Sequence, residues 1–323
     1  MSSAPLVSIL IRSMERPTLQ RALDSVAAQD DPNVEVVVVA AGESHGDLPE
    51  RCGAFPLRLV RSARRLARAQ AANVALEAAR GDWFNFLDDD DELLPMHVSR
   101  LRAALDANPG ARLAHSISED VSVLGARVGF HGGRFRPWRQ LDTGFFRPHC
   151  AMFASSLLDD GAYFDARFEI LEDMDFFIQC AQRTPFVLVD EVTTRYYVDT
   201  GDSGAGRGMN RDDARLGPAF QQLREKWADL ERSLHATPEF RAEQALWLIE
   251  NGHFPDAAPI VAQLLAEDPD SADARTLRVL QHIARGEMNR AQWVLERNGD
   301  RVPKIDAIAL KLDQVRARMA TRH

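Results

Sequence analysis

Five consecutive acidic residues, 88–92 with the sequence DDDDE, are the part of this chain best suited to chemistry. They follow a hydrophobic run and precede Pro95, a residue tolerated in the first turn of a helix. The acids are therefore expected at the carboxyl end of a strand, where open α/β sheets bind ligands. Because side chains two residues apart in an extended chain point the same way, Asp88 and Asp90 could jointly hold a hard divalent cation.

A diphosphate could complete the shell of this cation. Such an ion would neutralise the charge that grows on a departing nucleoside diphosphate. The alternative is an acidic loop that caps the next helix, since carboxylates also stabilise a helix N-terminus. The buried strand before the acids favours the metal site.

The elements that must position these acids alternate between β-branched runs and helical patterns. Strands are expected at residues 6–11, 34–39, 57–60 and 82–87, and an alanine-rich helix at residues 67–79. This alternation is typical of βαβ units, and it predicts an α/β fold with a parallel sheet.

Residues 5–200 resemble the family 2 inverting glycosyltransferases of the GT-A fold, the Rossmann-like fold of nucleotide-diphospho-sugar transferases. The buried strand and the acids after it match the family's DxD motif. The resemblance implies that Asp88 and Asp90 bind the metal, which is Mn2+ or Mg2+ in this family, and that Asp88 and Asp89 contact the donor. It also places Asn73, on the helix before this strand, in the donor site.

A second match lies at residues 164–177, which read FDARFEILEDMDFF. They resemble the family segment in which an ED pair starts a helix, and the resemblance implies that Asp173 is the catalytic base. Glu172 beside it is expected to take part in catalysis and to contact the acceptor. An inverting transfer needs one such carboxylate to deprotonate the attacking hydroxyl. Acids are also common at helix N-termini for structural reasons, but two ordered motifs together favour an enzyme.

The end of the second strand departs from the family pattern. Many members carry two aspartates there, one of which pairs with the donor base, whereas this chain has Ala40 and Ala41. The base is therefore expected to be held by backbone groups near Ala41 or by Glu43, or to differ from the usual uracil. The first strand also lacks the family's proline-threonine-tyrosine-asparagine stretch, and Arg12 is expected to face the nucleotide.

Two basic stretches stand out against the acidic background. Arg68 belongs to the first and could approach the donor diphosphate, although such runs are often solvated. Residues 121–141 contain no Asp or Glu and include Trp138 among several arginines. This stretch is either an acceptor-binding loop or an ordinary surface hairpin, and both alternatives stay open. His149 resembles an acceptor-side position of some relatives, whereas a lone histidine is often structural.

Beyond about residue 235 the strand signals stop. Two similar stretches, 252–257 and 286–291, are offset by 34 residues, which is the tetratricopeptide period. Fewer than three repeats rarely stand alone. The tail is therefore expected to pack on the catalytic domain, to bind a protein partner or to form a homo-oligomer. Its helices are expected at residues 241–251, 255–266, 272–285, 289–298 and 304–318.

These patterns divide the chain into three parts. Residues 1–232 are expected to form the GT-A domain and residues 236–300 the helical repeats. Residues 301–323 are expected to form a capping helix. The predicted fold class is thus an α/β GT-A domain followed by an all-α tail.

Composition excludes several classes of protein. The formal net charge of −9 argues against a nucleic-acid partner, because phosphate backbones are bound by excess Lys and Arg. The three cysteines contain no CxxC pair, which speaks against a disulfide framework or a zinc site. No apolar stretch approaches the roughly 20 residues that span a bilayer, and the start lacks the pattern of a signal peptide. A cytoplasmic protein is expected, one that could lie at the inner face of a membrane.

The preferred hypothesis is a metal-dependent glycosyltransferase of the hexosyltransferase type. It would move a sugar with inversion from a nucleotide-sugar donor to a saccharide or glycoconjugate acceptor. One alternative is a noncatalytic scaffold that has lost donor recognition and binds a protein through its repeats. Another is a nucleotidyltransferase, which would need a glycine-rich, lysine-containing loop after the first strand. The two retained carboxylate motifs favour the transferase, since unused clusters of like charge are costly.

Overall fold

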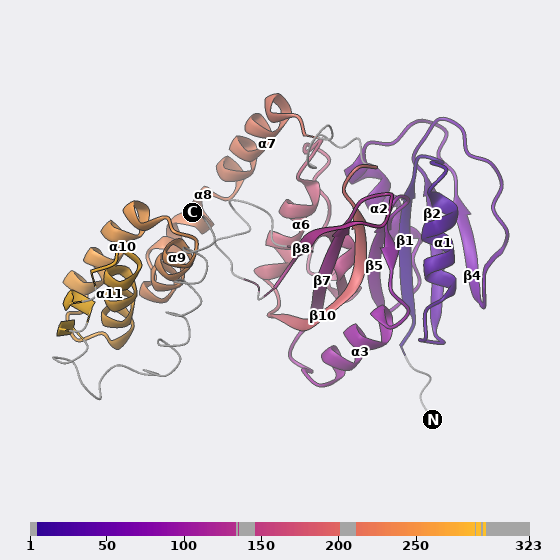
Figure 1. Ribbon diagram of the computed structural model, residues 1–323. Coiled ribbons are helices and arrows are strands. Elements are labelled where there is room, and N and C mark those ends of the chain that lie inside the picture. Colours follow the sequence, from indigo (N-terminus) through magenta and orange to yellow (C-terminus); the bar gives the residue numbers. More distant parts are fainter. Residues whose placement is uncertain are drawn as a thin grey trace. The chain divides into compact units, whose positions relative to one another are not determined.

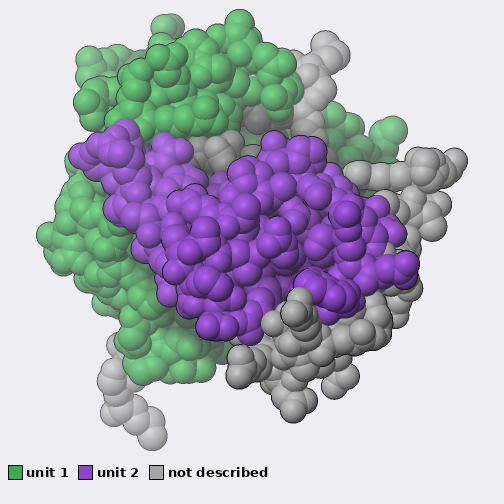
Figure 2. Space-filling view, turned by 90° about the vertical axis from the view of Figure 1, so that its left-hand side faces the viewer, with its two compact units in different colours: residues 1–226 green, residues 227–323 purple. Residues whose placement is uncertain are grey.

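The computed structural model describes residues 5–133, 135, 146–200, 211–287, 289–291 and 293–294. Two compact units divide the chain, Met1–Lys226 and Trp227–His323, and Figure 2 colours them separately. Helix α8 (Ala228–His235) crosses the boundary that the sequence places at residues 232–236. The three-part division drawn from the sequence stays a prediction.

Ten strands form one mixed sheet in unit 1, in the order β3-β4-β2-β1-β5-β9-β7-β10-β6, with β8 paired to β7 (Figure 1). Strands β4, β2, β1 and β5 run parallel, and β9 lies antiparallel between β5 and β7. The four strands expected from the sequence are confirmed as β1, β2, β4 and β5. The bounds are β1 Val7–Ser13, β2 Val34–Ala40, β3 Arg51–Cys52, β4 Phe55–Val60, β5 Trp83–Asp88, β6 Glu92–Leu93, β7 Leu113–Val121, β8 Arg127–His131, β9 Ala151–Ala154 and β10 Phe186–Tyr197.

The central strands carry apolar side chains on both faces, so helices cover both sides of this sheet. In β1, Leu10 belongs to the core that includes residues of α2 (Arg68–Ala78) and α6 (Glu172–Ala181). Its neighbours Ile9 and Ile11 point to the other face, whose core includes residues of α1 (Leu19–Ala27) and α3 (His97–Asp106). This alternation fixes the register of β1, because a slip of one residue would exchange the two faces.

The start of β5 depends on a glycine. A Cβ atom at Gly81 would lie 2.6 Å from Ser8 Oγ and 2.8 Å from the carbonyl oxygen of Leu6, which is closer than real Cβ contacts allow. The Gly81 amide donates to Ser8 Oγ, which in turn donates to the buried Glu35 carboxylate. These contacts place the entry of β5 against β1 and so set where the acids at its far end emerge.

The shorter elements of unit 1 are the 3-10 helix η1 (Pro148–Cys150), α5 (Ser156–Asp159) and α7 (Asp213–Lys226). Of the described helices, none is both long and apolar enough to cross a membrane.

Unit 2 contains α8 followed by α9 (Pro238–Glu250), α10 (Phe254–Glu267) and α11 (Ala272–Ala284). The helices expected at residues 241–251, 255–266 and 272–285 are confirmed. A separate apolar core joins α9, α10 and α11, and its most buried members include Ala245, Ile249, Ala257, Val261 and Val279. The expected helix at 304–318 and half of that at 289–298 lie outside the described residues.

Candidate active site

The acidic run lies at the carboxyl end of β5, as the sequence predicts. Asp88 is the last residue of that strand and stands in register with Arg12 of the neighbouring parallel strand β1. The strand is hydrophobic up to Leu87 and therefore buried, so the first acids emerge at the edge where β1 and β2 also end. Ligands of open α/β sheets bind at such an edge.

Arg12 joins the two motifs that lie far apart in the sequence. Its guanidinium donates to Asp88 Oδ1 from Nη2 at 2.7 Å and from Nε at 3.1 Å. Its Nη1 donates to Glu172 Oε1 at 2.9 Å. Burial would by itself lower the pKa of Arg12 and raise that of Asp88, but their ion pair shifts each pKa the opposite way. Both side chains therefore stay charged, and Asp88 and Glu172 share one cation.

The Asp89 carboxylate points into the protein. It accepts hydrogen bonds from the Met14 amide at 2.7 Å, from Ser13 Oγ at 3.2 Å and from Arg16 Nη1 at 2.6 Å. The Asp89 side chain is fully buried. These bonds tie the acidic turn to the loop after β1, and the donor contact predicted for Asp89 stays a prediction.

Asp90 has the least compensated charge of the four aspartates. Burial, followed by the carboxylates of Asp91 and Asp88, raises the pKa of Asp90 to about 7. Arg16 is the nearest cation, with Nη1 4.0 Å from Asp90 Oδ2. The backbone is held more firmly, because Arg21 Nη2 donates to the Asp90 carbonyl oxygen at 2.7 Å.

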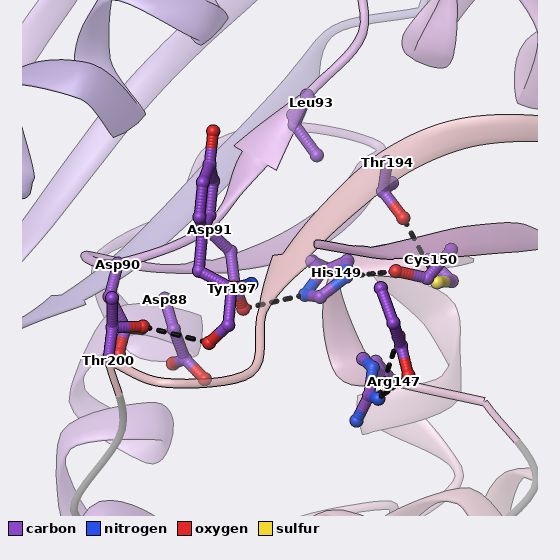
Figure 3. A network of polar contacts seen from close by, with 12 residues as sticks. Asp88, Asp90, Asp91, Leu93, Arg147, His149, Cys150, Thr194, Tyr197 and Thr200 are labelled. Carbon is purple, nitrogen blue, oxygen red and sulfur yellow. Dashed lines mark hydrogen bonds and ion pairs between the residues drawn. The ribbon is translucent and has the colours of Figure 1, made fainter. Parts of the chain in front are cut away.

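Asp91 also points into the protein, on the side opposite to β1. Its Oδ2 lies 3.1 Å from Nδ1 of His149, and its Oδ1 accepts a hydrogen bond from the Tyr197 amide at 3.1 Å (Figure 3). His149 is only 2% exposed and belongs to η1. The acceptor contact predicted for His149 is untested, but its ring is engaged with the acidic run.

The second motif begins α6. Leu171, the residue before this helix, has a φ of 65° in the left-handed region, where a branched residue is strained. Glu172 is buried and turned toward Arg12. Burial, then the Glu172 carboxylate, raises the pKa of Asp173 to about 6, although Arg12 lowers it in part. The carboxylate is therefore ionised at neutral pH but more basic than an ordinary aspartate.

Several other predicted donor residues lie along the same sheet edge. Arg68 is the first residue of α2 and, after Arg12, helps to lower the pKa of Asp88. The Ala41 amide donates to the Ser13 carbonyl oxygen, and the Ala41 carbonyl oxygen accepts from the Leu66 amide with one of its two lone pairs. The donor contact predicted for Ala41 stays a prediction.

Asn73, predicted in the donor site, does not join this cluster. The Asn73 side chain makes two hydrogen bonds with the backbone of Phe164 and so connects α2 to the segment before α6. Its donor contact stays a prediction. Trp138, predicted on the acceptor side, lies outside the described residues.

Sequence reasoning missed Arg16 and Tyr197. The Arg16–Asp89 pair is 73 residues apart in the chain, and the Tyr197–Asp91 pair is 106 residues apart. Neither pair leaves a local pattern that a sequence could reveal. The pairing of Asp91 with His149 was missed for the same reason.

Comparisons with known proteins show that this chain is similar to glycosyltransferases. Residues 9–161 match the model of glycosyl transferase family 2. An uncharacterized glycosyltransferase of Haemophilus influenzae is 29% identical over 105 residues, which are 32% of this chain and 36% of that protein. The uncharacterized glycosyltransferase YwdF of Bacillus subtilis is 25% identical over 209 residues, 61% of this chain and 76% of that protein. The chain therefore spans only about a third of the Haemophilus protein.

Solved structures show the same fold. The crystal structure of S. aureus TarS 1–349 has a TM-score of 0.51 and 18% sequence identity, covering 91% of this chain and 92% of that one. The complex of the same fragment with UDP-GlcNAc has a TM-score of 0.50 at 17% identity, with the same coverage. At such identity the likeness establishes a common fold.

Proposed function

Because residues 9–161 match the model of glycosyl transferase family 2, we propose that this chain is a metal-dependent inverting glycosyltransferase. It moves a sugar from a nucleotide-sugar donor to a hydroxyl of a saccharide or glycoconjugate. The observation that carries this proposal is the Arg12 guanidinium, which binds Asp88 of the first motif and Glu172 of the second. A scaffold without activity would have no need of this shared cation between the partly exposed Asp88 and the buried Glu172.

Asp88 and Asp90 are the groups that would hold Mn2+ or Mg2+. The pKa of Asp90 is raised first by burial and then by the neighbouring carboxylates, and a divalent cation would stabilise the ionised form of this cluster. The described residues provide no set of three or more protein ligands, so oxygens of the donor diphosphate would complete the shell. A bound cation would neutralise negative charge on the leaving diphosphate.

Asp173 acts as the general base in this proposal. The acceptor oxygen forms a bond to the anomeric carbon while the bond from that carbon to the diphosphate oxygen breaks, which inverts the configuration. The hydroxyl proton moves to the Asp173 carboxylate, and the electron pair of the broken bond leaves with the nucleoside diphosphate. A pKa of about 6 keeps Asp173 ionised at neutral pH yet basic enough to take this proton.

The first test is thermal unfolding with candidate donors, with and without Mn2+. UDP-GlcNAc comes first because a structural neighbour binds it, and UDP and GDP test the base that Ala41 leaves open. A ligand that binds only the folded state raises Tm by mass action. A Mn2+-dependent shift supports the transferase, whereas no shift with any nucleotide would favour the scaffold.

Asp90→Asn tests the metal assignment. The substitution keeps the side-chain size but removes the charge, so the Mn2+-dependent part of the nucleotide shift should disappear. Asp106→Asn, at an exposed position at the end of α3, is the matched control and should behave as wild type. An undiminished Mn2+ effect in Asp90→Asn would remove Asp90 from the metal site.

For unit 2 we propose a tetratricopeptide-like helical repeat that binds a protein partner or a second copy of the chain. Gly252 and Gly286, which are 34 residues apart, both have positive φ, 80° and 73°. The residue after each glycine donates to a carbonyl oxygen five residues back, His253 to Leu248 and Glu287 to His282, both at 2.8 Å. The same helix ending, a Schellman turn, thus recurs at the repeat period.

Size-exclusion chromatography with light scattering tests self-association.

A further inference from the structure

The ion pair between Asp91 and His149 is buried. The two side chains are 3% and 2% exposed, and Asp91 Oδ2 lies 3.1 Å from His149 Nδ1. They come from different parts of the fold, Asp91 from the turn after β5 and His149 from η1 before β9. The contact therefore connects the acidic turn after β5 to η1.

Further contacts hold both partners in place (Figure 3). Asp91 Oδ1 accepts from the Tyr197 amide, so each oxygen of this carboxylate has a protein partner. The other ring nitrogen of His149 lies 3.3 Å from Ser118 Oγ, and its ring stacks near Tyr196. With these bonds made, His149 has no ring nitrogen left to bind an acceptor.

The charge of this histidine fits its place. Burial would lower the pKa of His149, but the Asp91 carboxylate opposes this and raises it to about 10. The imidazole is thus a buried cation beside a run of acids. Among the described residues it has the same relation to Asp91 that Arg16 has to Asp89, so Asp90 lies between two anchored neighbours.

We propose that His149 is a positioning residue that holds the Asp91 carboxylate and thereby fixes the turn that presents Asp90 to the donor's metal–diphosphate group. This inference rests on the proposed function for its ligand, but not for the anchoring of the turn. A histidine that merely fills the core would affect folding without changing this turn. A histidine that binds the acceptor would affect acceptor binding alone.

His97 provides a matched control. It is fully buried, and its Nδ1 bonds to Thr193 Oγ1 at 2.6 Å, but within the described part of the chain no side-chain contact joins it to residues 88–92. His97→Gln therefore measures the cost of removing a buried hydrogen-bonded histidine from the same unit. His149→Gln and Asp91→Asn, singly and together, test the anchor.

The first measurement is amide hydrogen exchange of residues 88–94, which requires no ligand. Exchange should be faster in His149→Gln and Asp91→Asn than in His97→Gln at equal loss of Tm. Unchanged exchange in both variants would overturn the proposal, whether or not the protein is a transferase.

The second measurement is calorimetric binding of UDP, and of pyrophosphate as a probe without a base, in buffer with and without Mn2+. Loss of a group that orients a metal ligand typically weakens affinity by about 10- to 100-fold, and we expect this in both single variants. The double variant should bind these ligands no more weakly than the single variant of lower affinity, because the two residues act through one contact. His97→Gln should bind within about two-fold of wild type.

The outcomes separate the two ideas. Absence of Mn2+-dependent binding in the wild type would count against the proposed function and leave hydrogen exchange to decide the anchor. Wild-type affinity in His149→Gln, or effects that multiply in the double variant, would overturn the positioning role. A change confined to acceptor KM would assign His149 to the acceptor instead.

Discussion

At the scale of single residues, the environment of Asp173 determines how the site would respond to pH. Burial and the Glu172 carboxylate raise its pKa to about 6, and a general base must be ionised to act. At Mn2+ concentrations that keep Asp90 ionised, we therefore predict that kcat/KM is constant near neutral pH and falls roughly tenfold per pH unit below about pH 6. Initial-rate profiles with the identified donor test this, and a fall that begins near pH 4 would exclude Asp173 as the base.

The same shift has a consequence for stability. The pKa of Asp173 is higher in the folded chain than the ordinary value of 3.8, so its contribution to stability is present below pH 3.8 and is lost as pH rises through about 6. Asp173→Asn should remove this dependence together with transfer. It should leave Mn2+-dependent nucleotide binding nearly intact, since the substitution retains the size of the side chain.

Arg12 carries a second prediction at this scale. Its side chain is 11% exposed and its partner Glu172 is 4% exposed, so Arg12→Met leaves a buried carboxylate without its cation. Breaking such a buried pair typically costs ~3–5 kcal/mol of stability. Urea unfolding measures this loss.

Arg12→Lys is the matched variant for this pair. It keeps the positive charge but cannot reach Asp88 and Glu172 together through a planar fork. We expect it to recover part of the stability and less of the activity. Full activity in Arg12→Lys would show that charge alone suffices.

At the scale of elements, α6 is positioned by its neighbours as well as by its own sequence. Asp175 in its first turn is fully buried and accepts a hydrogen bond from Lys226 Nζ at 2.8 Å. Lys226 ends α7 and also reaches Asp165 at 2.9 Å. The helix that carries Glu172 and Asp173 is therefore fixed through a cation at the last residue of unit 1.

Lys226→Met should for this reason destabilise unit 1 by up to ~3–5 kcal/mol, because the buried Asp175 carboxylate loses this cation and keeps the hydrogen bond from Gln179 Nε2 at 2.8 Å. Chemical denaturation followed by tryptophan fluorescence measures the change. The double variant with Asp175→Asn should regain part of the loss, since the buried charge is then removed as well. If the loss of stability in the double variant equals the sum of the losses in the two single variants, the ion pair does not position α6.

At the scale of the whole molecule, the two units have separate apolar cores. All the buried residues of the α9–α11 core come from unit 2. Leu277 is 4% exposed in this core, and truncating a buried leucine to alanine typically costs ~2–5 kcal/mol. We predict that Leu277→Ala lowers one calorimetric transition while the transition stabilised by Mn2+ and nucleotide keeps its temperature. A single transition that shifts as a whole would show that the units unfold together.

The sequence alone predicts the four parallel strands β1, β2, β4 and β5 and the two acidic motifs. It does not predict the antiparallel strands β3, β6, β8 and β9, which make the sheet mixed rather than parallel. The β-branched runs of β1 and β2, the aromatic run of β5 and the alanine-rich α2 can be recognised locally, because they are buried on both faces or along one stripe. Helices α9, α10 and α11 were predicted for the same reason. The positions of Asp88 at a strand end and of Glu172 at a helix start follow directly from these boundaries.

The partner of each carboxylate in the acidic run is visible only in the tertiary structure. Asp89 and Asp91 turn inward to Arg16 and His149, whereas Asp88 shares Arg12 with Glu172 and Asp90 is left with little compensating charge. Five adjacent acids look alike in a sequence, since the direction of each side chain depends on partners brought by distant segments. Burial makes these partners decisive, because a carboxylate removed from water needs a cation or hydrogen-bond donors at contact distance.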